Sequence, residues 1–406
     1  MTRRVALLAA ALVAALGLAV AAVAATAPAE RDVLALMTAM ERAHPDLFTT
    51  TPKARFRAEA RALARRAPSL SRPQLVVGLM RLVALAGARN GHTAIYPYDA
   101  HPRPLRTYPV RLYVFPTGLH VVAAPGREAL VGARLTAIED VPVERILAAV
   151  KPLVARDNAS SYLDFMPEYV VTEEVLVGLG LTDGGSARFT FADGRSETLE
   201  PVSAPSFSPV GSVLAPLRRP AATQPVWLRF PERMQWLTTL AGGRAVYLGY
   251  RMTTNETWTV SRQLLRLASR PAVRHVVVDA RLNHGGDNTT YGALLGAMQE
   301  LAKRKTVVLL IGRSTFSAAG NFAADVDAVP RIRLVGEATG GAPSQWGDST
   351  VVEIPSPGLI ARVATTYQRF GRPSALTTRP DVAVQLTADD FVTGRDPVLE
   401  RALWLP

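Results

Sequence analysis

Residues 275–286 read HVVVDARLNHGG, and residues 306–320 read TVVLLIGRSTFSAAG. Each stretch starts with a continuous apolar run of strand length and ends in a polar junction that leads into a helical pattern. Continuous apolar strands between helices are typical of a parallel sheet that is buried on both faces. Ligand sites in such sheets lie at the carboxyl ends of the strands. The two junctions therefore predict an α/β fold and the place of its site.

The same alternation continues on both sides of these stretches. Apolar strand patterns recur at 245–250 and 332–335, and helical patterns recur at 260–268, 289–302 and 318–327. Residues 226–406 are therefore predicted to form one α/β core.

Residues 28–200 have a different hydrophobic pattern from the α/β core. In residues 28–103 apolar positions recur at three- and four-residue spacing, and Ser71-Arg72-Pro73 is typical of a helix start, which predicts a helical domain. Residues 104–200 contain short strand patterns, including a hairpin at 110–123 around Pro116-Thr117-Gly118. Six prolines within residues 201–225 predict a strap or linker.

Residues 1–27 have the features of a secretory signal. Arg3 and Arg4 precede an uncharged apolar run, and small residues around Ala25 and Ala27 suit cleavage. The run of residues 5–25 is also long enough to span a bilayer, so an uncleaved membrane anchor is the alternative. Either case predicts a secreted or periplasmic protein, in contact with a membrane only if the segment is retained.

Composition excludes several classes of site. The chain has no cysteine, which excludes disulfides, thiol nucleophiles and cysteinyl metal sites. The sequence contains no H-E-x-x-H motif, which is the spacing typical of a zinc site. Neither a metal nor another cofactor is expected. The formal charge of +12 comes mainly from arginine, but the arginines alternate with acidic residues instead of forming blocks. Nucleic acid is therefore not an expected partner.

The two junctions contain the candidate chemistry. The backbone N–H groups around Gly285 and Gly286 could bind an anion. The same sequence is also typical of a capped glycine turn with a purely structural role. Ser317 stands where a helix dipole favours developing negative charge. It is also a candidate N-cap residue, as is Ser314, and both interpretations stay open at this point.

Together the two junctions resemble the tail-specific protease family, which includes the C-terminal processing proteases and the tricorn core protease. Its members have a D-x-R-x-N-x-G-G motif and then a T-x-S-A motif with the nucleophilic serine. Here these motifs are Asp279 to Gly286 and Thr315 to Ala318. Further matches are Asn90-Gly91-His92-Thr93, Val335-Gly-Glu-Ala-Thr-Gly-Gly341, Pro380-Asp381-Val382 and Arg395-Asp396-Pro397-Val398-Leu399. The resemblance implies a crotonase-like (ClpP-like) core built from repeated strand, strand and helix.

One departure distinguishes the branches of the family. The processing branch uses a Ser–Lys dyad, but Ala342 occupies the corresponding position, and no lysine follows Lys305. Lys303 and Lys305 precede the strand that leads to Ser317, so we expect them near its opposite end. The chain thus looks closer to the tricorn-like branch, whose base is a histidine from an earlier segment. This resemblance implies that His92 is the base.

His284 beside the double glycine is the alternative base. A carboxylate should orient the imidazole, and Glu337 is the candidate, with Asp348 in the same neighbourhood. The family's tricorn branch has an acidic residue shortly before P-D, and residues 374–379 supply none.

The backbone N–H groups of Gly286 and Ala318 are the expected oxyanion hole. Residues 132–147 resemble only the later part of a PDZ module, so the middle domain is expected to be partly PDZ-like.

The sequence predicts a serine hydrolase, specifically a peptidase that acts on a peptide or protein through an acyl-enzyme. Ser317 would attack the carbonyl and His92 would accept the proton. The alternative is a non-catalytic relative that binds apolar ligands or peptides in the same cleft.

Overall fold

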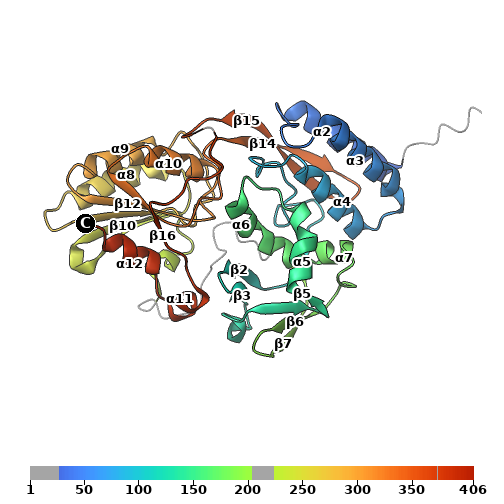
Figure 1. Cartoon of the computed structure of the whole chain (residues 1–406), viewed down its shortest axis with the longest axis horizontal. Helices are drawn as coiled ribbons and strands as arrows, with labels where there is room; N and C mark the ends of the chain where they lie inside the picture. Colours follow the sequence, from blue (N-terminus) through green and yellow to red (C-terminus); the bar gives the residue numbers. More distant parts are fainter. Residues whose placement is uncertain (1–26, 204–223, 373) are drawn as a thin grey trace, which may run out of the picture.

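The computed structural model describes residues 27–203, 224–372 and 374–406 (Figure 1). Nearly all of the predicted targeting segment and most of the predicted proline-rich strap lie outside these residues. Among the helices of the described ranges, none combines the length and the apolar character needed to span a bilayer.

A six-stranded sheet with the order β16-β13-β12-β11-β10-β9 forms the centre of residues 226–406. The strands from β10 to β16 run parallel, and the edge strand β9 pairs antiparallel with β10. The largely parallel sheet predicted from the apolar runs is confirmed. Its strands are β9 (Gln235–Leu240), β10 (Ala245–Tyr250), β11 (His275–Asp279), β12 (Thr306–Ile311), β13 (Ile332–Gly336) and β16 (Val382–Ala383).

Helices cover both faces of this sheet, which explains why its strands are apolar throughout. Alternate side chains such as Val276 and Val278 pack on the face covered by three helices, and Val277 packs on the opposite face with Val398 and Leu399. The three helices are α8 (Glu256–Ala268), α9 (Gly292–Leu301) and α10 (Ala318–Asp327). The opposite face packs on α12 (Pro397–Leu403), and α11 (Ala388–Thr393) precedes it (Figure 1).

The N-terminal region is helical. Its helices are α2 (Pro28–Ala43), α3 (Lys53–Arg66) and α4 (Arg72–Ala84). Ser71 caps α4 through the backbone N–H of Gln74, whose side chain returns a hydrogen bond to the Ser71 backbone. The helix start expected at this serine is confirmed.

Residues 104–203 mix small sheets with helices. The expected hairpin is present as β2 (Arg111–Phe115) and β3 (Gly118–Ala123). Two further helices were not predicted, namely α6 (Ala159–Val170), which contains Pro167, and α7 (Glu173–Gly178). The remaining elements are α5 (Val143–Val150), β1 (Arg106–Thr107), β4 (Leu135–Ile138), β5 (Val141–Pro142), β6 (Ala187–Phe191), β7 (Ser196–Leu199) and β8 (Val202–Ser203).

A long hairpin joins the sheet region to the N-terminal helices. Its strands are β14 (Gln345–Ile354) and β15 (Leu359–Gln368), and both contact α2. Figure 1 shows this hairpin reaching from the core across to the blue helices. The backbones of Arg362 on β15 and Ala94 exchange two hydrogen bonds, so the hairpin holds the segment that follows His92. In this way a segment from the N-terminal region is brought to the carboxyl ends of the parallel strands.

Candidate active site

Ser317 lies between the end of β12 and the start of α10. Its backbone has φ 53° and ψ −130°, which is a strained conformation for a residue with a Cβ. Its side chain makes no capping hydrogen bond to the helix. The N-cap interpretation of Ser317 therefore does not describe its hydroxyl, and the strained turn points this group away from the helix backbone.

His92 contacts that hydroxyl. The Nε2 atom of His92 lies 2.9 Å from Oγ of Ser317, although 225 residues separate them in sequence. The imidazole stacks on the ring of Phe316, with 4.6 Å between centroids. The Gly91 N–H donates to Oδ1 of Asp157 over 2.7 Å, so a buried carboxylate holds the backbone directly before the histidine. The structure thus brings together the expected nucleophile and the expected base.

Burial controls the protonation of this site. It lowers the pKa of His92 to about 4, while the nearby Asp348 carboxylate and the Trp346 backbone act in the opposite direction. The ring is therefore neutral at pH 7, which is the form that can accept a proton from serine. Burial also raises the pKa of Asp157 to about 7, against the hydrogen bonds from the Gly91 and Ala342 backbone N–H groups.

The structure does not bring Glu337 to the imidazole. Its carboxylate pairs with Arg313 at 2.6 Å and accepts a hydrogen bond from Tyr113. Within the described residues Nδ1 of His92 has no hydrogen-bond partner of normal geometry. The groups that favour the charged ring come from β14, where Asp348 has φ 49°, while Arg362 of β15 lowers the pKa of the ring.

The glycine junction packs directly on the nucleophile. The φ of Gly285 is 114°, and a methyl group there would lie 2.5 Å from Cβ of Ser317 and 3.0 Å from the Ala318 nitrogen. Within the described residues, no acceptor takes the backbone N–H of Gly286 or of Ala318. The two N–H groups expected to form an oxyanion hole are therefore both available, on junctions that touch each other.

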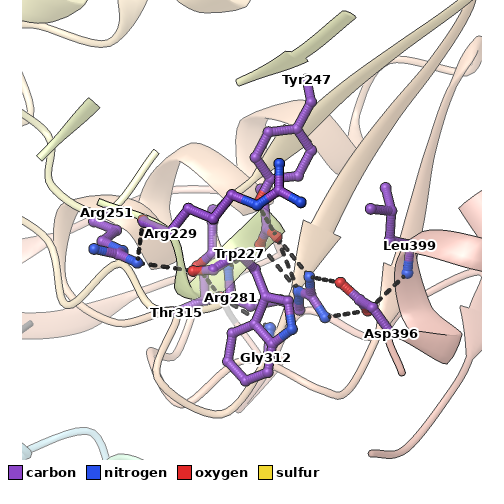
Figure 2. Close-up of polar contacts among 11 residues, drawn as sticks. Trp227, Arg229, Tyr247, Arg251, Arg281, Gly312, Thr315, Asp396 and Leu399 are labelled. Atoms are coloured by element: carbon purple, nitrogen blue, oxygen red, sulfur yellow. Dashed lines mark hydrogen bonds and ion pairs between the residues drawn. The ribbon is translucent and has the colours of Figure 1, made fainter. Parts of the chain in front are cut away.

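The D-x-R part of the first junction has a structural role. The buried guanidinium of Arg281 pairs with Asp279 at 2.6 Å and with Asp396 at 2.8 Å, and lies 5.0 Å from the centroid of the Trp227 ring. Oδ1 of Asp396 also accepts from the backbone N–H of Leu399 and so caps the start of α12 (Figure 2). This network ties the end of β11 to the C-terminal helix and holds the loop that leads to the glycines.

Thr315 ties the two junctions together. Its hydroxyl donates to the Ala280 carbonyl over 2.8 Å and accepts from the Gly312 N–H over 3.0 Å; Figure 2 labels Thr315 and Gly312. The threonine of the T-x-S-A motif therefore supports the loop geometry instead of reaching the reacting atoms.

A cavity of about 310 Å³ opens beside Ser317 and His92. Four aromatic side chains line it, together with ionisable groups from α6, β15 and two loops. The aromatic residues are Tyr96, Tyr98, Phe165 and Phe316, and the ionisable residues are Asp99, Asp164, Glu168, His284 and Arg362. A larger hollow of about 790 Å³ lies over α3, α4 and residues 151–159, and its lining does not include Ser317. The smaller cavity is the one that could hold a substrate side chain next to the nucleophile.

Lys303 and Lys305 precede β12 and do not line this cavity. Nζ of Lys305 donates to the Val273 carbonyl, at the edge of the sheet where β11 and β12 begin. Their expected place, at the end of the strand opposite Ser317, is confirmed. Ala342, at the position of the family's lysine, is buried, and its N–H donates to Asp157. Among the described residues, no group of three or more His, Asp or Glu side chains could hold a metal ion.

Sequence reasoning missed two residues of this region, Asp157 and Asp164. Asp157 precedes α6, and Asp164 lies within it, so an element that was not predicted contains or adjoins both. The polar pair Asp157-Asn158 was the available local signal, because Asn158 caps α6 through the Ser161 N–H.

Comparison with solved structures identifies proteins that have the same fold. No protein-family model and no curated protein matches the sequence. Among solved structures, a mutant of CPAF matches with a TM-score of 0.63 at 12% identity, over 92% of this chain and 95% of that one. The chain has the fold of CPAF. Mature CPAF, alone and complexed with lactacystin, matches with a TM-score of 0.60 at 13% and 12% identity, over 92% of this chain and 95% and 96% of those chains. CPAF is a serine protease, so this mixed α/β fold resembles that of serine peptidases.

Proposed function

We propose that this protein is a secreted or periplasmic serine peptidase that acts through an acyl-enzyme. The observation that supports it most strongly is the 2.9 Å contact between Nε2 of His92 and Oγ of Ser317. A serine hydroxyl is a weak nucleophile until an adjacent base removes its proton. The contact joins a nucleophile and a neutral imidazole at hydrogen-bond distance, next to two available backbone donors.

The chemistry then follows from the geometry. Oγ of Ser317 attacks the substrate carbonyl, and its proton passes to Nε2 of His92. The resulting oxyanion accepts hydrogen bonds from the N–H groups of Gly286 and Ala318. The imidazolium returns the proton to the leaving amine, and water then releases the acyl group by the same steps. The cavity of about 310 Å³ would receive the side chain next to the scissile bond.

The orienting group in this proposal belongs to the β14–β15 hairpin instead of Glu337. The Trp346 backbone and the Asp348 carboxylate favour the protonated ring, which forms during the attack. The left-handed backbone of Asp348, the 2.6 Å pair of Glu337 with Arg313 and the absence of an acid in residues 374–379 all favour this assignment. Because no lysine lies near the serine, we propose that the chain is closer to the tricorn-like branch. The proposal also includes a crotonase-like core and a partly PDZ-like middle domain.

A fluorophosphonate probe tests the proposal. Ser317 should displace fluoride from phosphorus and become covalently labelled, while His92 takes the proton. We expect labelling of the wild-type protein, none of Ser317→Ala, and labelling of His92→Ala that is slower by about 10²–10⁴-fold. Ser269→Ala is the matched control, since Ser269 is exposed at the end of α8, outside the cavity lining, and should not affect the rate.

The second candidate function is binding of an apolar ligand or peptide without turnover. The observation that favours it is the cavity with four aromatic side chains beside a histidine that lacks an acidic hydrogen-bond partner in the described residues. Folded wild-type protein that takes up no probe but binds an apolar fluorophore with one-to-one stoichiometry would support this candidate over the peptidase.

A further inference from the structure

Asp164 bridges the two junctions that form the candidate site. One carboxylate oxygen, Oδ1, accepts a hydrogen bond from the hydroxyl of Ser314, and the other, Oδ2, lies 3.0 Å from Nε2 of His284. His284 immediately precedes the double glycine, and Ser314 lies three residues before Ser317. A single side chain on α6 therefore holds both loops from outside the sheet.

We propose that Asp164 is a positioning residue that sets the geometry of the oxyanion hole. This inference rests on the proposed function, because the hole is assigned through it. The two donor N–H groups belong to different junctions, so their separation depends on how those junctions sit relative to each other. The bridge through Asp164 links the junctions by side chains, in addition to the backbone hydrogen bond from the Phe316 N–H to the Asn283 carbonyl.

The surroundings of Asp164 make this bridge specific. Asp164 is only 8% exposed, so its carboxylate depends on these two donors in place of water. Within the described residues Nδ1 of His284 has no hydrogen-bond partner, so the bond to Asp164 is the one that orients the imidazole. Loss of the carboxylate would release the His284 ring and the Ser314 hydroxyl together.

The need for such a bridge follows from strain. Ser317 has a positive φ, and strained residues persist only where the surrounding structure over-determines them. A shift of about 1 Å in a catalytic group can cost about 100-fold in rate. A carboxylate that fixes two loops from a third element is a way to prevent this shift.

The adjoining helix α7 supplies a matched control. Glu174 is 6% exposed, pairs with Arg72 of α4 at 2.6 Å and lies outside the cavity lining. It contacts neither junction through a hydrogen bond or ion pair in the described residues. Glu174→Gln thus removes a comparable buried charge without touching the cavity or the bridge.

The first test is the kinetics of fluorophosphonate labelling. For Asp164→Asn we expect the maximal labelling rate to fall about 100-fold, with the probe concentration at half-maximal rate changed less than twofold. Glu174→Gln should label like wild type. His284→Gln, whose amide can still donate to Asp164, should retain more activity than His284→Ala. A wild-type rate in Asp164→Asn would overturn the proposal, as would a loss seen only in the half-maximal concentration.

Hydrogen exchange measured by mass spectrometry tests the bridge without any catalysis. In Asp164→Asn, amides in residues 284–287 and 314–319 should exchange faster together, by about tenfold or more, and Glu174→Gln should leave both segments unchanged. Faster exchange in only one segment, or in neither, contradicts the bridge even if the wild type is labelled. If the wild type is not labelled and both segments still respond, the peptidase proposal fails while the bridge stands.

Discussion

Gly285 lies against Ser317 so closely that a methyl group on the glycine would come within 2.5 Å of the serine Cβ. The two residues are on different junctions, and this approach places the glycine loop beside the nucleophile.

The first prediction concerns this approach. Gly285→Ala should reduce fluorophosphonate labelling by at least about 100-fold, because the added Cβ must displace Ser317 and because φ of 114° disfavours an L side chain. Gly296→Ala, at an open position inside α9, should leave labelling unchanged and stabilise the protein by about 0.5–1 kcal/mol. Labelling kinetics and urea unfolding of both variants check this. Normal labelling of Gly285→Ala would show that the loop does not support the nucleophile.

The second prediction is the pH profile of labelling. Since burial lowers the pKa of His92 to about 4, the ring stays neutral well below the usual histidine range. The labelling rate should thus remain flat from pH 7 to about pH 5 and fall as the pH drops through about 4. Tryptophan fluorescence at each pH would show that the protein is still folded. A midpoint near pH 6.5 would mean that His92 is solvated or is not the base.

The third prediction concerns stability and Asp157. Its pKa is raised to about 7 in the folded state, from 3.8 in the unfolded chain, so the folded state binds more protons between these values. The contribution of this carboxyl to the free energy of unfolding is therefore complete below pH 3.8. It is lost as the pH rises through 7, and the loss amounts to about 4 kcal/mol.

Asp157→Asn isolates this effect. As the pH rises from 4 to 8, the unfolding free energy of the wild type should fall relative to that of the variant. Urea titrations at several pH values measure it, and a difference that does not vary with pH would contradict the assignment.

The fourth prediction concerns the Arg281 network. Asp396→Asn should destabilise the protein by about 3–5 kcal/mol, since it leaves a buried guanidinium with one carboxylate and alters the cap of α12. Asp193→Asn breaks an exposed pair with Arg195 and should have no measurable effect on the urea midpoint. Equal midpoints for the two variants would show that the network is not a source of stability.

Much of the core was predictable because its signals are local. The strands at 245–250, 275–279 and 306–311 and the helix at 318–327 have the predicted bounds, since apolar runs and periodicity depend on neighbours in sequence. α8 begins at Glu256, earlier than predicted, because its first turn (Glu256-Thr-Trp-Thr259) is largely polar and its one apolar residue, Trp258, is exposed. α6 was missed because Pro167 lies within it and its cap pairs Asn158 with Ser161 instead of a glutamate or glutamine.

By itself, the sequence determined which chemistry is available. It placed Ser317 after a buried strand, two glycines after the neighbouring strand and His92 in a glycine-containing loop, and it excluded thiol and Ser–Lys chemistry. Only the tertiary structure decided which groups meet. It brought His92 to Ser317 and paired Glu337 with Arg313. It also brought Asp348 of β14 and Asp164 of α6 to the site. These contacts join segments up to 256 residues apart, as between His92 and Asp348, and depend on how the hairpin and helices pack, which no local pattern encodes.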